Sequence, residues 1–256
     1  MPSTEIFPNS LVKQVIFAAQ FPNLFFLEGL IGQFQSAIMG QFPSSQLLIR
    51  RSLLLTEGDQ KRLAELSISD DESQKDTKVW QFESEEGVTL GLTTSTLSLT
   101  SNSHKTYNLG DGKRFRDVIE FTCNEFLRLT GIPKILRLGL RYVNECPIFE
   151  NTTASFKDSY DSTLPVDRFP IESVSEMHSQ VVSEQLPYRV RHIERIASDG
   201  SVRKLVLDFD AWAERVPSGG YLETTDALHE IIWNEFSRTI REPVLAHMRQ
   251  PIEVKK

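Results

Sequence analysis

The sequence predicts an α+β protein with a mostly antiparallel β-sheet, or sheets, and three long helices. Short segments of alternating hydrophobicity come in runs, turn residues separate neighbouring segments, and an amphipathic helix pattern follows each run. This order argues against a doubly wound parallel sheet, in which strands and helices alternate one by one. The similar order of the two halves leaves open two related β-rich units with a helix each, or one sheet built by duplication.

The N-terminal half begins with a strand and a helix. Val and Ile favour a strand over 11–21, which Pro22 ends. Apolar residues at three- and four-residue spacings predict a helix over 24–41. The residues expected on its inner face are Leu27, Ile31, Phe34 and Ile38. Further strands are expected over 46–55, 79–83 and 88–93 and around Leu97 and Leu99, and a second helix over 111–130 with Asp111 as its cap.

The C-terminal half begins with the clearest strand of the chain, over 135–146. Gly131-Ile132-Pro133 before it is a helix stop. Strand alternation places Leu138, Leu140 and Tyr142 on one face, which we assign to the core. The remaining expected elements are a long loop over 150–172, strands over 179–186, 188–197 and 202–210, and a last helix that Thr224 or Thr225 caps and Pro243 kinks or ends.

These elements divide the chain into an N-terminal α+β unit over 1–131 and a C-terminal α+β unit over 132–256, unless the two form one continuous domain. The N-terminal unit contains an acidic block. Residues 57–76 include seven acids and three bases, and the chain as a whole has a formal charge of −7. We expect a mobile acidic loop over 57–77, with an acidic docking tail as the alternative.

Composition and motifs exclude several classes of protein. Two cysteines among 256 residues make neither a disulfide scaffold nor a four-cysteine zinc site, so we expect free thiols and a cytoplasmic location. The chain contains no glycine-rich phosphate loop, no Gly-x-Ser-x-Gly and no His-Glu-x-x-His. We therefore expect no cofactor and no catalytic residue, and we favour a protein that is not an enzyme over an enzyme.

One segment is unusually poor in charge. From Gln14 to Ile49 the only charged residue is Glu28. Glutamines and prolines interrupt this segment, so it predicts no membrane span. Two interpretations remain open: a buried strand and helix, or an apolar surface that docks a partner. The second favours a protein partner, and it leaves a homo-oligomer open.

Two predicted strands place arginines on the face opposite to the core. Arg137 and Arg141 flank Gly139, and two guanidiniums beside a glycine leave room for a planar anion. The candidate anion- or nucleic-acid-binding residues are Arg137, Arg141, Arg189, Arg191 and Arg195. The alternative is that each arginine pairs with a carboxylate or faces water. For Arg141, the internal acids that we expect are Asp208 and Asp210.

Asp208 and Asp210 end a predicted strand and share one of its faces. Such a pair can hold a divalent metal ion when other oxygen ligands join it, and it can equally pair with arginines. Because no third acid lies at a fixed spacing, the sequence predicts no metal site.

Four segments together resemble a known family. They are Val79-Trp80-Gln81-Phe82, Leu138-Gly139-Leu140-Arg141-Tyr142-Val143-Asn144, Leu207-Asp208-Phe209-Asp210 and the helix from His229 to Phe236. In this order they resemble an uncharacterised, sporadically distributed prokaryotic family of similar length, with a Leu-Arg-Tyr-x-Asn strand motif. That family has no established activity. The resemblance implies a prokaryotic setting, and the patchy distribution implies an accessory system such as phage defence.

The sequence therefore predicts a non-enzymatic binding or regulatory protein that acts in a complex with a protein partner. The alternative is a protein that binds nucleic acid or nucleotide phosphate through the arginine-rich face of its sheet.

Overall fold

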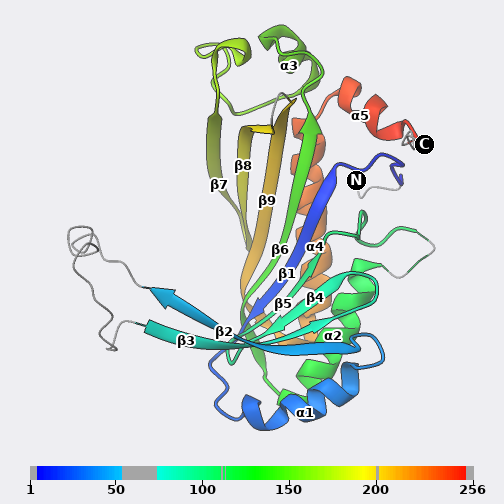
Figure 1. The fold of residues 1–256 in the computed structure, drawn as a ribbon, viewed down its shortest axis with the longest axis vertical. Coiled ribbons are helices and arrows are strands. Elements are labelled where there is room, and N and C mark those ends of the chain that lie inside the picture. The colour runs from blue at the N-terminus through cyan, green and yellow to red at the C-terminus, as the bar shows by residue number, and fades with distance from the viewer. Residues whose placement is uncertain (1–4, 54–73, 111, 113, 200–201, 252–256) are drawn as a thin grey trace.

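The structure is a computed structural model that describes residues 5–53, 74–110, 112, 114–199 and 202–251. Within these ranges nine strands form one sheet, and every pair of neighbouring strands is antiparallel (Figure 1). Five α-helices accompany the sheet, two more than the three that the sequence predicts. The predicted class, α+β with a mostly antiparallel sheet, is confirmed.

The strands follow the order β2-β3-β4-β5-β1-β6-β9-β8-β7 across the sheet. Their bounds are Val12–Gln20 (β1), Ser44–Leu53 (β2), Gln74–Glu83 (β3), Val88–Leu92 (β4), Thr96–Ser101 (β5), Lys134–Pro147 (β6), Met177–Gln185 (β7), Tyr188–Asp199 (β8) and Val202–Pro217 (β9). Outward from the central β1–β6 pair, β5, β4 and β3 follow on one side, and β9, β8 and β7 follow on the other. One sheet therefore joins the segments 1–131 and 132–256.

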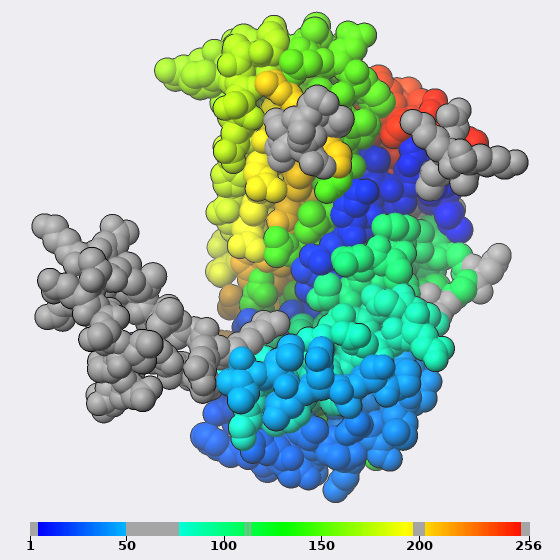
Figure 2. Space-filling view, viewed as in Figure 1, coloured from blue at the N-terminus to red at the C-terminus, as the bar shows by residue number. Residues whose placement is uncertain are grey.

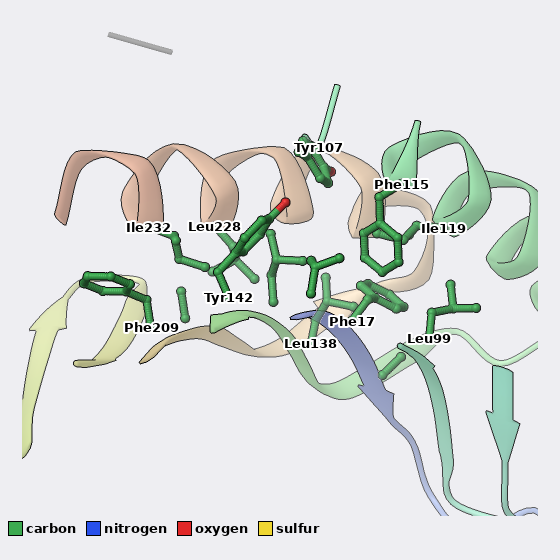
Figure 3. Packing of buried hydrophobic residues seen from close by; sticks show 14 of the residues in the cluster. Phe17, Leu99, Tyr107, Phe115, Ile119, Leu138, Tyr142, Phe209, Leu228 and Ile232 are labelled. Atoms are coloured by element: carbon green, nitrogen blue, oxygen red, sulfur yellow. The ribbon is translucent and has the colours of Figure 1, made fainter. Parts of the chain in front are cut away.

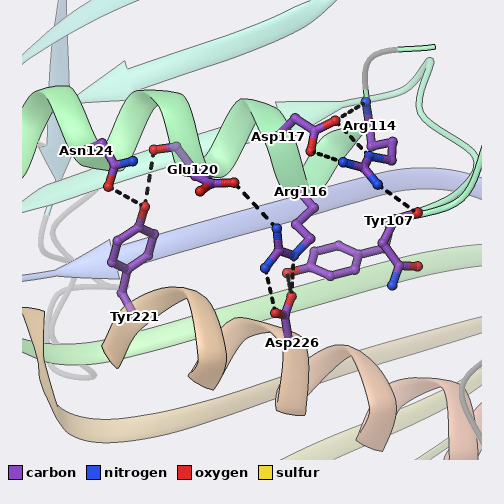
Figure 4. A network of polar contacts seen from close by, with 9 residues as sticks. Tyr107, Arg114, Arg116, Asp117, Glu120, Asn124, Tyr221 and Asp226 are labelled. Atoms are coloured by element: carbon purple, nitrogen blue, oxygen red, sulfur yellow. Dashed lines mark hydrogen bonds and ion pairs between the residues drawn. The ribbon is translucent and has the colours of Figure 1, made fainter. Parts of the chain in front are cut away.

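Helices cover one face of the sheet. The α-helices are Leu27–Ile38 (α1), Phe115–Thr130 (α2), Thr153–Ser159 (α3), Tyr221–Thr239 (α4) and Glu242–Arg249 (α5). Helices α2 and α4 lie behind the sheet in Figure 1, and α1 packs beside α2. Arg116 of α2 ties the two long helices together through a bidentate ion pair with Asp226 of α4, at 2.8 and 2.9 Å (Figure 4).

The core lies between the sheet and these helices. Leu138, Leu140 and Tyr142 point toward it, as strand alternation predicts, and are almost fully buried. They meet side chains of α2 and α4 such as Phe115 and Leu228 (Figure 3). Of the predicted inner face of the first helix, Leu27, Phe34 and Ile38 are buried and Ile31 is partly buried against the core. Since apolar burial is the main favourable term in folding, this layer holds the helices on the sheet.

The ends of two helices show which local predictions hold. Gly131 caps α2 in a left-handed conformation (φ 62°) and its N–H donates to the carbonyl of Leu127, so the predicted helix stop is confirmed. The predicted cap of the last helix is wrong. Helix α4 starts at Tyr221, and Thr225 lies inside it, where its hydroxyl donates to the carbonyl of Tyr221.

Three further predictions need correction. The expected loop over 150–172 contains helix α3, which Thr152 caps, because burial of Phe156 stabilises a helix too short to show a periodic pattern. Strand β9 continues to Pro217, seven residues past its expected end, because it pairs with β6 along that whole length. Pro243 lies in the first turn of α5, where a missing N–H costs no hydrogen bond, rather than at the end of α4.

The mobile loop predicted over 57–77 falls mostly outside the described residues. Its last part does not: residues 74–77 belong to strand β3 and pair with the end of β2. The strand therefore begins five residues earlier than the expected 79–83. Asp111, the expected cap of α2, also lies outside the described residues, and Arg114 takes the cap position through a capping box with Asp117.

Candidate functional site

The face of the sheet that α2 and α4 leave open holds the arginines that the sequence singles out. Figures 1 and 2 view the molecule onto this face. On β6 the side chains of Arg137 and Arg141 project from it, while Leu140 between them is buried on the helix side. The antiparallel registers place β9 between β6 and β8, so arginines from both neighbouring strands meet the acids of β9.

Arg141 makes the tightest of these contacts. Its Nε donates to Asp208 Oδ1 at 2.7 Å, and its Nη2 donates to Oδ2 at 2.5 Å. Asp208 lies diagonally across from Arg141, because Arg141 is directly opposite Asp210 in the register. The hydrogen bonds to this carboxylate raise the pKa of the Arg141 guanidinium. The internal pair that the sequence predicts for Arg141 is confirmed.

Asp210 is shared by two arginines. Arg191 Nη2 donates to its Oδ2 at 2.8 Å, and Arg137 Nη2 donates to the same oxygen at 3.2 Å. To reach Asp210, Arg137 extends past Gly139, and its guanidinium lies 4.8 Å from the ring centre of Trp212. Asp208 and Asp210 lie in the middle of β9, so the expectation that they end a strand is wrong. Their pairing with arginines is the alternative to a metal site that the sequence leaves open.

Gly139 has a different role from the predicted one. A Cβ at this position would lie 3.2 Å from Arg137 Nη1, so the missing side chain makes room for the guanidinium of Arg137 itself. The expected space for a planar anion above this glycine is thus filled from within the chain.

The remaining arginines lie toward the edges of the face. Arg189 pairs with Glu214 and with Glu184, both at 3.3 Å. The side chain of Arg195 is exposed and has no ion-pair partner among the described residues. Four of the five candidate arginines are thus neutralised by carboxylates of this chain. On the described open face, arginines alternate with acidic side chains, so this face is not the positive surface that the sequence suggests.

The described part of the chain contains no cluster of metal-ligating side chains, and both cysteines are buried. No three His, Cys, Asp or Glu side chains there gather as a metal ion requires. Cys123 and Cys146 are free and buried, and burial raises the pKa of both thiols, which keeps them protonated. In the same ranges no helix has the length and apolar character needed to span a bilayer.

A second exposed surface lies at the β2 edge of the sheet, and the sequence does not predict which residues form it. Residues 74–79 of β3 pair only with β2, so the two strands project beyond the sheet as a ribbon (Figure 1). We call residues 47–53 and 74–80 the β2–β3 arm. Leu47 and Ile49 on this arm are 55% and 59% exposed. Both belong to the charge-poor segment 14–49, for which burial is one of the two interpretations.

The exposed residues of the arm face the side of the sheet that α1 covers. Leu47 is opposite Trp80 and Ile49 is opposite Lys78. Lys78 Nζ donates to Glu28 of α1 at 3.0 Å, which places the first turn of the helix beside Ile49. Phe25, just before α1, is 87% exposed. The absence of charge over 14–49 indicated such a surface, but it could not show which apolar residues remain uncovered.

Comparison with known proteins found no match: no protein-family model, no curated protein and no solved structure matches the chain.

Proposed function

We propose that this protein is a non-enzymatic binding protein that acts in a complex with a protein partner, and that the β2–β3 arm and the start of α1 form the docking surface. The observation that carries the proposal is the exposure of Leu47 and Ile49 on an edge strand. Clustered apolar side chains at the surface mark interaction sites, and an edge strand offers unpaired backbone groups to an incoming strand.

The chemistry of the partner follows from the neighbouring charges. The segment that links the two strands of the arm, residues 54–73, contains six acids and two bases. We therefore expect an extended segment that is apolar where it meets Leu47 and Ile49, with basic residues that complement the acids of this part of the sequence.

We also propose a biological setting for this complex. The resemblance to a sporadically distributed prokaryotic family favours a cytoplasmic complex in an accessory system, such as phage defence. The matching strand order on the two sides of the β1–β6 pair supports two related units in one sheet. The alternative function, binding of nucleic acid or nucleotide phosphate, loses support because carboxylates of the chain pair with Arg137, Arg141, Arg189 and Arg191.

Site-specific photo-crosslinking tests the docking surface. A benzophenone amino acid at position 47 should give one dominant crosslinked protein in the native host, while the same probe at Leu186 should not. Leu186 is the matched control because it is 85% exposed and follows β7, at the opposite edge of the sheet.

The crosslinked protein is then purified, and its affinity is measured against variants of the chain. Ile49→Asp should weaken binding by about tenfold or more, since it places a charge in an apolar contact, and Leu186→Asp should leave binding unchanged. Equal crosslinking from both positions, or equal affinity of the two variants, would refute the surface. Crosslinks only between copies of this chain would show a homo-oligomer instead of a complex with another protein.

A further inference from the structure

A pocket lies on the helix side of the sheet, away from the β2–β3 arm. It opens between β6, α4, the segment 105–109 and the N-terminal residues 5–12, and it has a volume of about 80 Å³. Its walls are mainly apolar. They include Leu11, Ile232, Trp233, Phe236 and Met248. Apolar walls with a few polar groups are the usual composition of a small-molecule site.

Tyr142 of β6 contributes the first polar group of the pocket wall. The tyrosine is only 6% exposed, and its hydroxyl is enclosed and has no hydrogen-bond partner among the described residues. Figure 3 shows this hydroxyl directed away from the sheet, toward Tyr107 and helix α4. A buried hydroxyl without a partner costs free energy, and most buried polar groups therefore have one. The cost is recovered if a ligand supplies the partner.

The second polar group is His229 of α4. Its ring lies 6.0 Å from that of Tyr142, centre to centre, and it makes no hydrogen bond within the described residues. It stacks on Tyr107 with ring centres 4.4 Å apart. The hydroxyl of Tyr107 donates to Asp226 at 2.8 Å, and Asp226 is held by Arg116 (Figure 4). This chain of contacts keeps the imidazole in place beside the pocket.

Charged groups at the rim are already engaged within the chain. Glu5 pairs with Arg249 at 2.9 Å. Lys105 Nζ donates to the carbonyls of Val12 and Asn102, at 2.7 and 3.0 Å. Asn144, a further polar residue of the wall, donates its Nδ2 to the carbonyl of Leu207 at 3.3 Å. In the described part of the chain, Tyr142 and His229 thus lack hydrogen bonds, while Asn144 and the charges at the rim have them.

We propose that this pocket binds a small, uncharged organic molecule with an apolar body and one hydroxyl, carbonyl or amide group, which hydrogen-bonds to the Tyr142 hydroxyl and the His229 ring. Burial lowers the pKa of His229 to about 4 and raises the pKa of Tyr142, so both groups are neutral near pH 7. A charged ligand would be desolvated there without a counter-ion, which disfavours it. The pocket is smaller than the ~150 Å³ cavity that encloses benzene, but it is partly open to solvent, so a ring can enter with one edge at the mouth.

Phenol and toluene are suitable probes because they have nearly the same shape, and only phenol has a hydroxyl. NMR titration of the full-length protein should show that both enter the pocket and that phenol binds more tightly. In Tyr142→Phe, phenol should bind about 3–10-fold more weakly, as expected for the loss of one neutral hydrogen bond, while toluene should bind as before. Tyr142→Phe should also melt at the same or a higher temperature, since it removes an unpaired buried hydroxyl.

Tyr160→Phe is the matched control, because Tyr160 is a buried tyrosine outside the pocket whose hydroxyl donates to Pro147. It should leave the binding of both probes unchanged. Failure of phenol to bind the native protein, or equal phenol affinity in the native protein and Tyr142→Phe, would overturn the proposal. Ile49→Asp should bind phenol normally, so this result is independent of the proposed docking surface.

Discussion

At the scale of single residues, Arg141 shows how a candidate ligand-binding group is engaged inside the chain. Its guanidinium donates two hydrogen bonds to Asp208, and the Asp208 side chain is only 10% exposed. Strand alternation predicts the face on which Arg141 lies. The carboxylate that it meets is 67 residues away in the sequence, and only the pairing of β6 with β9 brings the two together.

Removing one member of this pair should destabilise the fold. We expect Arg141→Ala to lower the free energy of unfolding by about 2 kcal/mol, because it leaves a nearly buried carboxylate without its partner. The value lies below that of a fully buried pair because the Arg141 side chain is 38% exposed. The loss of unfolding free energy is measured by urea unfolding of Arg141→Ala, Asp208→Ala and the double variant. The coupling energy should be about 1 kcal/mol or more, and additive effects would show that the pair contributes little.

His229 should make stability depend on pH. Burial lowers its pKa in the folded protein from the ordinary 6.5 to about 4. As the pH falls, the unfolded chain therefore takes up the proton first. The stabilising effect is complete above about pH 6.5 and is lost as the pH falls to about 4, for a total of about 3 kcal/mol.

The measurement is the free energy of unfolding between pH 4 and 7. His229→Gln should flatten the loss of stability in this range, although other groups still titrate there. His178→Gln is the control, since His178 is exposed on β7, and its profile should follow that of the native protein. A His229→Gln profile parallel to the native one would contradict the prediction.

At the scale of single elements, α1 illustrates a helix whose apolar stripe packs into the core. Phe34 is almost fully buried and meets the rings of Phe82 and Phe126 edge-on, each at 6.0 Å. Phe34→Ala should cost about 3–5 kcal/mol in thermal or urea unfolding, since it opens a cavity between β3, α1 and α2. A loss below about 1 kcal/mol would place the stripe at an interface instead of in the core.

Gly32→Ala is a useful companion in the same helix. A Cβ at Gly32 would meet no atom within 4 Å, so alanine should be neutral or stabilising by up to about 1 kcal/mol. A large loss in both variants would mean that α1 tolerates no substitution, and the effect of Phe34→Ala could not then be assigned to its buried ring.

At the scale of the whole molecule, the central β1–β6 pair makes the two segments parts of one sheet and one core. We therefore expect them to unfold together. Variants that retain only Trp80, in the N-terminal segment, or only Trp212, in the C-terminal segment, should give fluorescence midpoints in urea that coincide. Separate midpoints would show that each segment is a cooperative unit of its own.

The sequence by itself determined the class of the fold, the apolar faces of the long helices, the core face of β6 and the helix stop at Gly131. Each of these depends on periodicity or conformational preference within a few consecutive residues, which the sequence displays directly. Only the tertiary structure decided the order of the strands, the pairing of Arg141 with Asp208, the filling of the space above Gly139, the exposure of Leu47 and Ile49, and the pocket beside Tyr142 and His229. These features arise where segments distant in the chain pack together, and their energies depend on neighbours that no local pattern specifies.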